Sequence, residues 1–141
     1  MSIEDRLNIQ ELNFKYALYV DTFEPDNWAQ IFAPDAVLDE SAFFADALFA
    51  GRDAIRSYGA KIKENVHHII HLITNHIISD LTATSGRGTA FALVETMRKT
   101  GERLRFYVRY DDEYVKIGDS WLIAKRKLDK SLPPEKVTSA T

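Results

Sequence analysis

The chain carries histidines in a single short segment, at His67, His68, His71 and His76. An imidazole titrates near neutral pH, with an unperturbed pKa of about 6.5, so it suits general acid–base chemistry. His71 differs from the others because it lies inside an apolar run, between Ile70 and Leu72. Two interpretations follow: a core histidine satisfied by one hydrogen bond, and a base that faces a pocket.

A metal site at these histidines depends on the local secondary structure. His67 and His71 could share a zinc ion only on a helix, where they would be one turn apart. On a strand, the same pair would be about 13 Å apart, too far for one ion with ligand bonds near 2.1 Å. Residues 69–78 favour a strand because β-branched side chains predominate in this segment. We therefore expect no metal site and no other cofactor.

A carboxylate and a phenol near the end of the first predicted helix are further candidates. Asp21 closes this helix, where a negative charge opposes the helix dipole. It is either a solvated loop carboxylate or an inward one that orients an imidazole and stabilises its charged form. Tyr16 stands five residues earlier, about 7.5 Å along the helix axis. By default Tyr16 is a core aromatic, and alternatively its hydroxyl polarises a substrate oxygen.

An arginine interrupts the apolar face of the last predicted strand. If Trp121, Ile123 and Lys125 share one face, Arg126 lies on the other, with Leu122 and Leu128. A guanidinium among apolar neighbours either faces a pocket or pairs with an acid. The sequence leaves both alternatives open.

The elements that must position these residues follow from periodicity and turn signals. Helices are expected at residues 3–20, after Asp26 as N-cap, and at 52–65. Strands are expected at 36–41, 69–78, 86–98, 103–117 and 120–129, whereas 42–50 is ambiguous between strand, lid and short helix. The acidic triplet at 111–113 interrupts the alternation and predicts a bulge. Helices before a largely antiparallel meander define an α+β fold.

Composition bounds the remaining possibilities. The 141 residues are 45% hydrophobic and suit one domain, which we place at 1–130, followed by a flexible tail at 131–141. The lack of cysteine excludes disulfides, thiolate catalysis and iron–sulfur clusters. A net charge of −3 without a basic block argues against a nucleic-acid partner, and no segment is long and apolar enough to suggest a membrane partner. Cytoplasmic location is the default expectation.

Four segments in the same order resemble the SnoaL-like proteins of the NTF2-like superfamily: 9–39, 51–58, 70–75 and 121–128. The branch resembled contains scytalone dehydratase, bile acid 7α-dehydratase and γ-hexachlorocyclohexane dehydrochlorinase. The resemblance implies three helices on a strongly curved sheet that encloses a deep apolar pocket. It also places the family's Asp–His dyad on Asp21 and His71, a family tyrosine on Tyr16, and a pocket arginine on Arg126. The dehydrochlorinase's lysine has no match, because Tyr16 takes that place.

The resemblance implies a cofactor-independent lyase that dehydrates a small cyclic or aromatic-like molecule. His71 would remove a proton beside a carbonyl, Asp21 would hold the imidazole, Tyr16 would polarise the carbonyl, and Arg126 would steady negative charge. The pocket would be lined by Phe43, Phe44, Phe49, Trp28 and Asn75. Alternatives are an isomerase or polyketide cyclase with the same dyad, and a non-catalytic ligand-binding module similar to a dioxygenase small subunit. A homo-oligomer, trimer or dimer, is expected.

Overall fold

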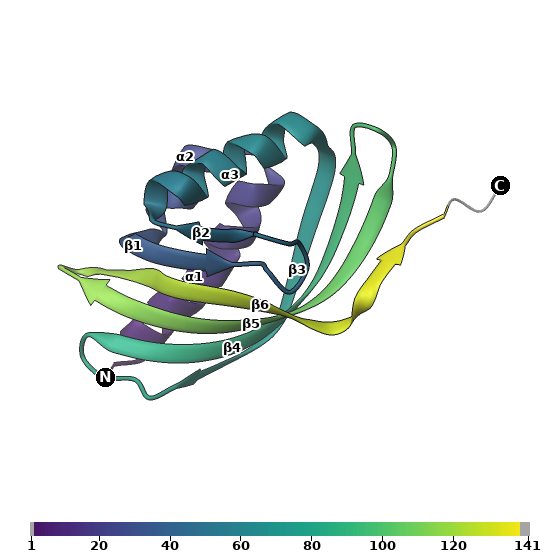
Figure 1. The fold of residues 1–141 in the computed structure, drawn as a ribbon. Helices are drawn as coiled ribbons and strands as arrows, with labels where there is room; N and C mark the ends of the chain where they lie inside the picture. Colours follow the sequence, from purple (N-terminus) through teal and green to yellow (C-terminus); the bar gives the residue numbers. More distant parts are fainter. Residues whose placement is uncertain (1, 139–141) are drawn as a thin grey trace.

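A computed structural model describes residues 2–138 as an α+β fold (Figure 1). The helices and strands follow the chain in the order α1 (Ile3–Asp21), α2 (Pro25–Gln30), β1 (Phe32–Asp39), β2 (Leu48–Ala50), α3 (Arg52–Asn65), β3 (Val66–Ser79), β4 (Ser85–Arg98), β5 (Arg103–Ile117) and β6 (Ser120–Lys136). The fold class and the helix–helix–strand–helix–meander order are as predicted.

One curved, unclosed sheet organises the molecule. Its strand order is β2-β1-β6-β5-β4-β3, so β3 and β2 form the two edges. Strands β3 to β6 form an antiparallel meander, whereas β1 joins β6 in parallel. Figure 1 shows the long strands bending along their length, with the three helices on one side of the sheet. The space between the helices and the concave face is where a cavity can form.

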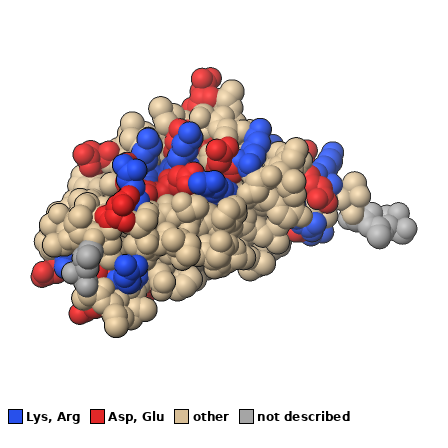
Figure 2. Space-filling model, turned by 90° about the horizontal axis from the view of Figure 1, so that it is seen from below, with Lys and Arg blue, Asp and Glu red and all other residues tan. Residues whose placement is uncertain are grey.

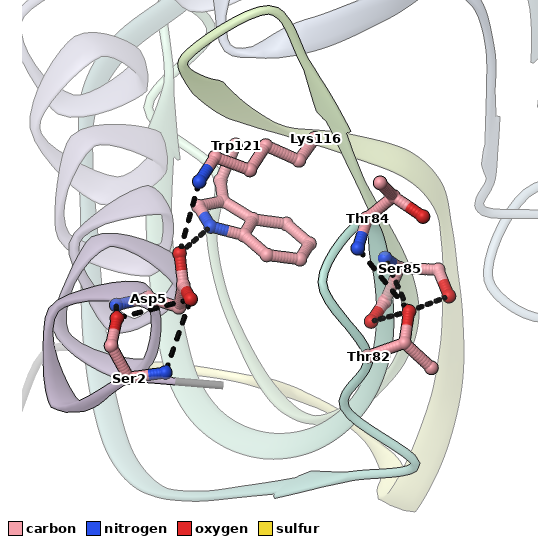
Figure 3. A network of polar contacts seen from close by, with 7 residues as sticks. All are labelled: Ser2, Asp5, Thr82, Thr84, Ser85, Lys116 and Trp121. Carbon is pink, nitrogen blue, oxygen red and sulfur yellow. Dashed lines mark hydrogen bonds and ion pairs between the residues drawn. The ribbon is translucent and has the colours of Figure 1, made fainter.

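Helix α1 is fixed at its N-terminus by a capping box and by the far end of the sheet. Ser2 accepts from the backbone N–H of Asp5, and the Asp5 carboxylate accepts from the backbone N–H of Ser2. The same carboxylate accepts from Trp121 Nε1 at 2.9 Å and from Lys116, both of the β5–β6 hairpin (Figure 3). These bonds, that from Trp121 foremost, lower the pKa of Asp5 far below its usual range. The hairpin thereby sets the position of α1.

The buried face of α1 is formed by Ile9, Leu12, Tyr16 and Val20, whereas Leu7 is exposed. Asn13 takes an inner position instead, because it bonds to a buried charge described below. The inner face of α1 is therefore partly polar.

The sheet keeps a strict alternation along β5. Phe106, Val108 and Tyr110 are buried on the concave face, while Arg105 and Arg109 lie on the outer face. Outer-face charges pair across strands, as in Arg105 with Glu95, and along β5, as in Arg109 with Asp111. Seen from below Figure 1, acidic and basic side chains intermingle in one band (Figure 2). No large field of one sign forms on this face.

A bulge in β6 changes which of its residues face inward. Tyr114 pairs with Ile123 and Glu113 with Lys125, so Ala124 is an extra residue in β6. Trp121 and Ile123 therefore share the buried side with Arg126 and Leu128, which corrects the prediction that Trp121 and Arg126 lie on opposite faces. The predicted irregularity at 111–113 exists, but the extra residue is in the partner strand.

The last strand is longer than predicted. Residues 131–136, expected in a flexible tail, continue β6, with Leu104 opposite Lys136 and Arg105 opposite Glu135. Pro133 and Pro134 are tolerated because β1 pairs with β6 only as far as Lys127, which leaves one edge unpaired. Residues 137 and 138 follow the strand without regular structure, and the rest of the expected tail, 139–141, lies outside the described residues.

Between α1 and α3, the bounds of the helix and of the strands differ from those predicted. Helix α2 begins at Pro25, so Glu24 is the N-cap and Asp26 lies within the first turn; the predicted cap at Asp26 is wrong. A proline at the first helical position needs no N–H partner, which explains the earlier start. Strand β1 begins earlier than predicted, at Phe32, and the ambiguous residues 42–50 form turns followed by the short β2.

No helix within residues 2–138 is long and apolar enough to cross a membrane.

Candidate functional site

A cavity of about 500 Å³ lies between the helices and the concave face of the sheet. This volume fits a small ligand of one or two rings. Its lining is mainly aromatic and aliphatic, contributed by all three helices and by β3 to β6. The polar groups on this lining define the chemistry that the cavity can support.

His71 lines the cavity and is held from behind by Asp21. Its Nδ1 lies 2.7 Å from Asp21 Oδ1, and its backbone N–H donates to Asp21 Oδ2 at 2.9 Å. The backbone bond is available because β3 is an edge strand, whose outer amides lack a strand partner. The carboxylate thus fixes both the ring and the backbone of His71.

The Asp21 contact defines the tautomer of the imidazole. A carboxylate is an acceptor only, so Nδ1 carries a proton, and in the neutral form of the ring the lone pair is on Nε2. No described residue bonds to Nε2. Only 7% of the His71 side chain is exposed. The arrangement fixes the orientation of an imidazole at the cavity wall.

Tyr16, Tyr110 and Trp28 form the aromatic wall beside His71. The ring of Tyr16 lies edge-on to the His71 ring, with centroids 5.7 Å apart, and also contacts the rings of Trp28 and Tyr110. Burial raises the pKa of Tyr16 well above its usual value, so its phenol stays protonated. Trp28 Nε1 and the Tyr110 hydroxyl are buried without a partner among the described residues.

Arg126 lies behind this wall and is not among the residues that line the cavity. Its guanidinium makes a two-point ion pair with Asp112, at 2.9 Å and 2.8 Å, and also donates to Asn13. Its Cζ lies 4.4 Å from the Tyr16 ring centroid and 4.2 Å from that of Tyr110. Burial alone would lower the pKa of Arg126, but the Asp112 carboxylate reverses this and the net direction is upward. Of the two alternatives left open by the sequence, the geometry shows an ion pair.

The ion pair continues into a buried hydrogen-bond chain. The Tyr114 hydroxyl donates to Asp112 at 2.6 Å and lies 2.9 Å from His76 Nε2. Gly88 packs so closely on this pair that a Cβ there would lie 2.7 Å from the Tyr114 oxygen. His76 therefore belongs to the packing behind the cavity and not to its lining.

The expected pocket residues are only partly brought together. Phe43, Phe44 and Trp28 line the cavity. Phe43 and Phe44 belong to the turn after β1 and both pack edge-on against Phe106. Phe49 stacks on the outside of a lining residue, Tyr58, with centroids 4.1 Å apart. Asn75 is exposed on β3, away from the cavity.

Glu40 and Tyr58 are cavity residues whose pairing the sequence did not reveal. Glu40 is 6% exposed, and its Oε1 accepts from the Tyr58 hydroxyl at 2.8 Å. Burial raises the pKa of Glu40 to about 7, although the bond from Tyr58 acts in the opposite direction. A sequence signal existed: Ala36 and Leu38 are the buried positions of β1, and the same alternation places residue 40 inward.

The other histidines give no metal site. His67 and His68 are exposed at the start of β3, with ring centroids 4.2 Å apart. Across residues 2–138, no group of three or more His, Cys, Asp or Glu side chains is arranged to hold a metal ion.

Solved structures with this architecture define the class of fold. A candidate aromatic ring hydroxylase from Novosphingobium aromaticivorans superposes with a TM-score of 0.90 at 27% identity, covering 97% of this chain and 96% of that one. A candidate scytalone dehydratase from the same organism gives 0.86 at 19% identity, covering 98% and 91%. A hexachlorocyclohexane dehydrochlorinase from Novosphingobium barchaimii gives 0.85 at 17% identity, covering 98% and 93%. The chain has the NTF2-like fold.

Within that class, the family model described as a SnoaL-like domain matches residues 1–127, and the chain belongs to the SnoaL-like family. An uncharacterized protein of Mycobacterium tuberculosis is 27% identical over 128 residues, which span 88% of this chain and 84% of that protein. The family and fold expected from the sequence are thus confirmed, and the structural neighbours include enzymes.

Proposed function

We propose that the protein is a cofactor-independent lyase that dehydrates small cyclic β-hydroxy ketones. The observation that carries this proposal is the imidazole of His71, held by Asp21 with Nε2 free at the wall of a largely apolar cavity. The scytalone dehydratase and dehydrochlorinase neighbours support elimination chemistry on this fold.

In this mechanism, His71 Nε2 removes the proton from the carbon beside the ketone. Asp21 accepts the hydrogen bond from Nδ1–H throughout and stabilises the imidazolium that forms. The ketone oxygen becomes negative as the proton leaves, and the phenol of Tyr16 lies edge-on beside His71 to donate to it. The C–O bond at the β-carbon then breaks with its electron pair on oxygen, which takes up a proton and leaves as water, so that the conjugated enone remains. Overall, the proton lost from carbon is matched by the proton gained by oxygen.

Arg126 acts through other side chains in this account. The guanidinium is held by Asp112 and packs on the rings of Tyr16 and Tyr110. It therefore positions the two phenols and adds positive charge behind them, and does not bind the substrate itself. This replaces the role expected for Arg126 from the sequence.

The test uses 3-hydroxycyclohexanone as the probe and mass spectrometry of the product. We expect loss of one water with the wild-type protein, and a fall of about 10²- to 10⁴-fold in kcat/KM for His71→Ala. The matched control is His67→Ala, since His67 is an exposed histidine of the same strand. Full turnover by His71→Ala would contradict the proposal.

Isomerisation is the second candidate, because the same dyad can move a proton without a leaving group. The probe is 3-cyclohexen-1-one, which would become 2-cyclohexen-1-one at unchanged mass. Turnover of this enone together with no dehydration of 3-hydroxycyclohexanone would assign the site to an isomerase.

A further inference from the structure

Glu40 is a second ionisable group of the cavity that the mechanism above leaves unused. It follows β1, whereas His71 belongs to β3, and the strands β6, β5 and β4 separate these two in the curved sheet. Both side chains line the same cavity. The curvature of the sheet therefore brings a carboxyl group and an imidazole to different walls of one small space.

The surroundings of Glu40 favour its neutral form. The residue is 6% exposed, and its only ion-pair or hydrogen-bond partner among the described side chains is the hydroxyl of Tyr58, on Oε1. No described lysine or arginine pairs with it. A buried carboxyl without a cation is more stable protonated, as its raised pKa indicates. Oε2 has no bond to a described residue.

Tyr58 and the turn after β1 hold this carboxyl in place. The ring of Tyr58, a residue of α3, stacks on Phe49, and its hydroxyl donates to Oε1. The backbone N–H of Glu40 donates to Ala47, and its carbonyl accepts from Phe43 and Phe44. The turn after β1 thus holds Glu40 in place and also contains Phe43 and Phe44, which line the cavity.

We infer that Glu40 is a catalytic acid that protonates the departing hydroxyl group, opposite His71 as the base. This inference rests on the dehydratase function proposed above and adds a residue to it. Hydroxide is a poor leaving group, so elimination of water gains from a proton donor at the oxygen. Glu40 and His71 lie on different walls of the cavity, so one can act on the hydroxyl oxygen while the other acts on the carbon.

The proton and electron balance of the step is closed. His71 Nε2 takes the proton from carbon, and the C–H electron pair becomes the C=C bond. The C–O bond breaks with its electron pair on oxygen, which takes the proton from Glu40 and leaves as water. The enzyme then holds imidazolium at His71 and carboxylate at Glu40. Transfer of one proton from His71 to Glu40, through water in the emptied cavity, restores the starting state.

The test separates the two proton transfers with two probes. Dehydration of 3-hydroxycyclohexanone needs both the base and the acid. Deuterium uptake by cyclohexanone in D₂O needs only the base, because this ketone has no leaving group. We expect Glu40→Gln to lower dehydration by about 10²- to 10⁴-fold while deuterium uptake stays within about twofold of wild type. The matched control is Glu64→Gln, an exposed carboxyl at the end of α3.

The pH profile gives a readout that a purely structural role would not move. The groups that face or adjoin Glu40 are Tyr58 on α3, Tyr16 on α1, Tyr110 on β5 and Asp39 on β1. Burial raises the pKa of the three phenols, so Glu40 is the acid among them that titrates near pH 7. Wild-type dehydration should fall as the pH rises through about 7. Tyr58→Phe removes the bond that lowers the pKa of Glu40, so this limb should move to higher pH.

The outcomes are distinct. Dehydration by Glu40→Gln at the wild-type rate would overturn the inference, as would an equal loss of dehydration and of deuterium uptake. Unchanged deuterium uptake in His71→Ala would instead contradict the proposed function. If Glu40→Gln fails to fold, the Tyr58→Phe profile decides, and an alkaline limb that stays in place overturns the inference.

Discussion

The buried pair of Arg126 and Asp112 gives the sharpest energetic prediction. Both side chains are fully buried, and they form two direct hydrogen bonds. Replacing Asp112 by Asn leaves the guanidinium charge uncompensated in the interior, between two phenol rings. Removing one partner of such a pair costs about 3–5 kcal/mol of unfolding free energy. With a urea dependence of about 2 kcal/mol per molar, the unfolding midpoint should fall by roughly 2 M.

The assay is urea unfolding followed by circular dichroism. The control is Arg87→Gln, which removes the exposed pair with Glu113 at 3.8 Å and should change stability by less than about 1 kcal/mol. The double variant Asp112→Leu/Arg126→Met should regain much of the loss, because it buries no unpaired charge. A loss below about 1 kcal/mol for Asp112→Asn would refute this reasoning.

Two further predictions concern stability near the cavity. Because burial raises the pKa of Glu40 from 4.5 to about 7, the folded state binds an extra proton between these values, and wild-type stability falls as the pH rises through this window. Glu40→Gln should therefore be more stable than wild type above pH 7, by up to about 3 kcal/mol, with little difference below pH 4.5. If the urea midpoints of the two proteins had the same pH dependence, this prediction would be contradicted. Gly88→Ala should lose about 1–3 kcal/mol, because its Cβ would lie 2.7 Å from the Tyr114 hydroxyl and 2.8 Å from His76 Nε2; an unchanged melting temperature would show that these groups move aside.

Local patterns in the sequence predicted the elements because neighbouring residues decide them. The alternation along β5 and the β-branched run of β3 depend on contacts within one strand, and both are as expected. The sequence indicated an irregularity near 111–113, but not that the extra residue would be Ala124 in β6, because this depends on how two strands pair. Because of that bulge, Arg126 lies on the same side of the sheet as Trp121, where it pairs with Asp112.

In the candidate site, too, some residues could be predicted from the sequence and others depend on tertiary contacts. His71 and Asp21 could be singled out by residue type and placement, and the structure brings them together. Glu40 was missed because its environment depends on the bond from Tyr58 and on burial. Both are tertiary effects, and the residues next to Glu40 in the sequence do not reveal them. Asn75 was expected in the pocket, but it is exposed. It lies where the pairing of β3 with β4 shifts register, between Ile73 and His76.

The central claim is that His71 Nε2 removes a proton from carbon while Asp21 holds the ring. Deuterium uptake by cyclohexanone in D₂O, followed by mass spectrometry, measures this step without any leaving group. We expect uptake with wild type, a loss of about 10²- to 10⁴-fold with His71→Ala, and an intermediate loss with Asp21→Asn. Uptake by His71→Ala at the wild-type rate would contradict the claim.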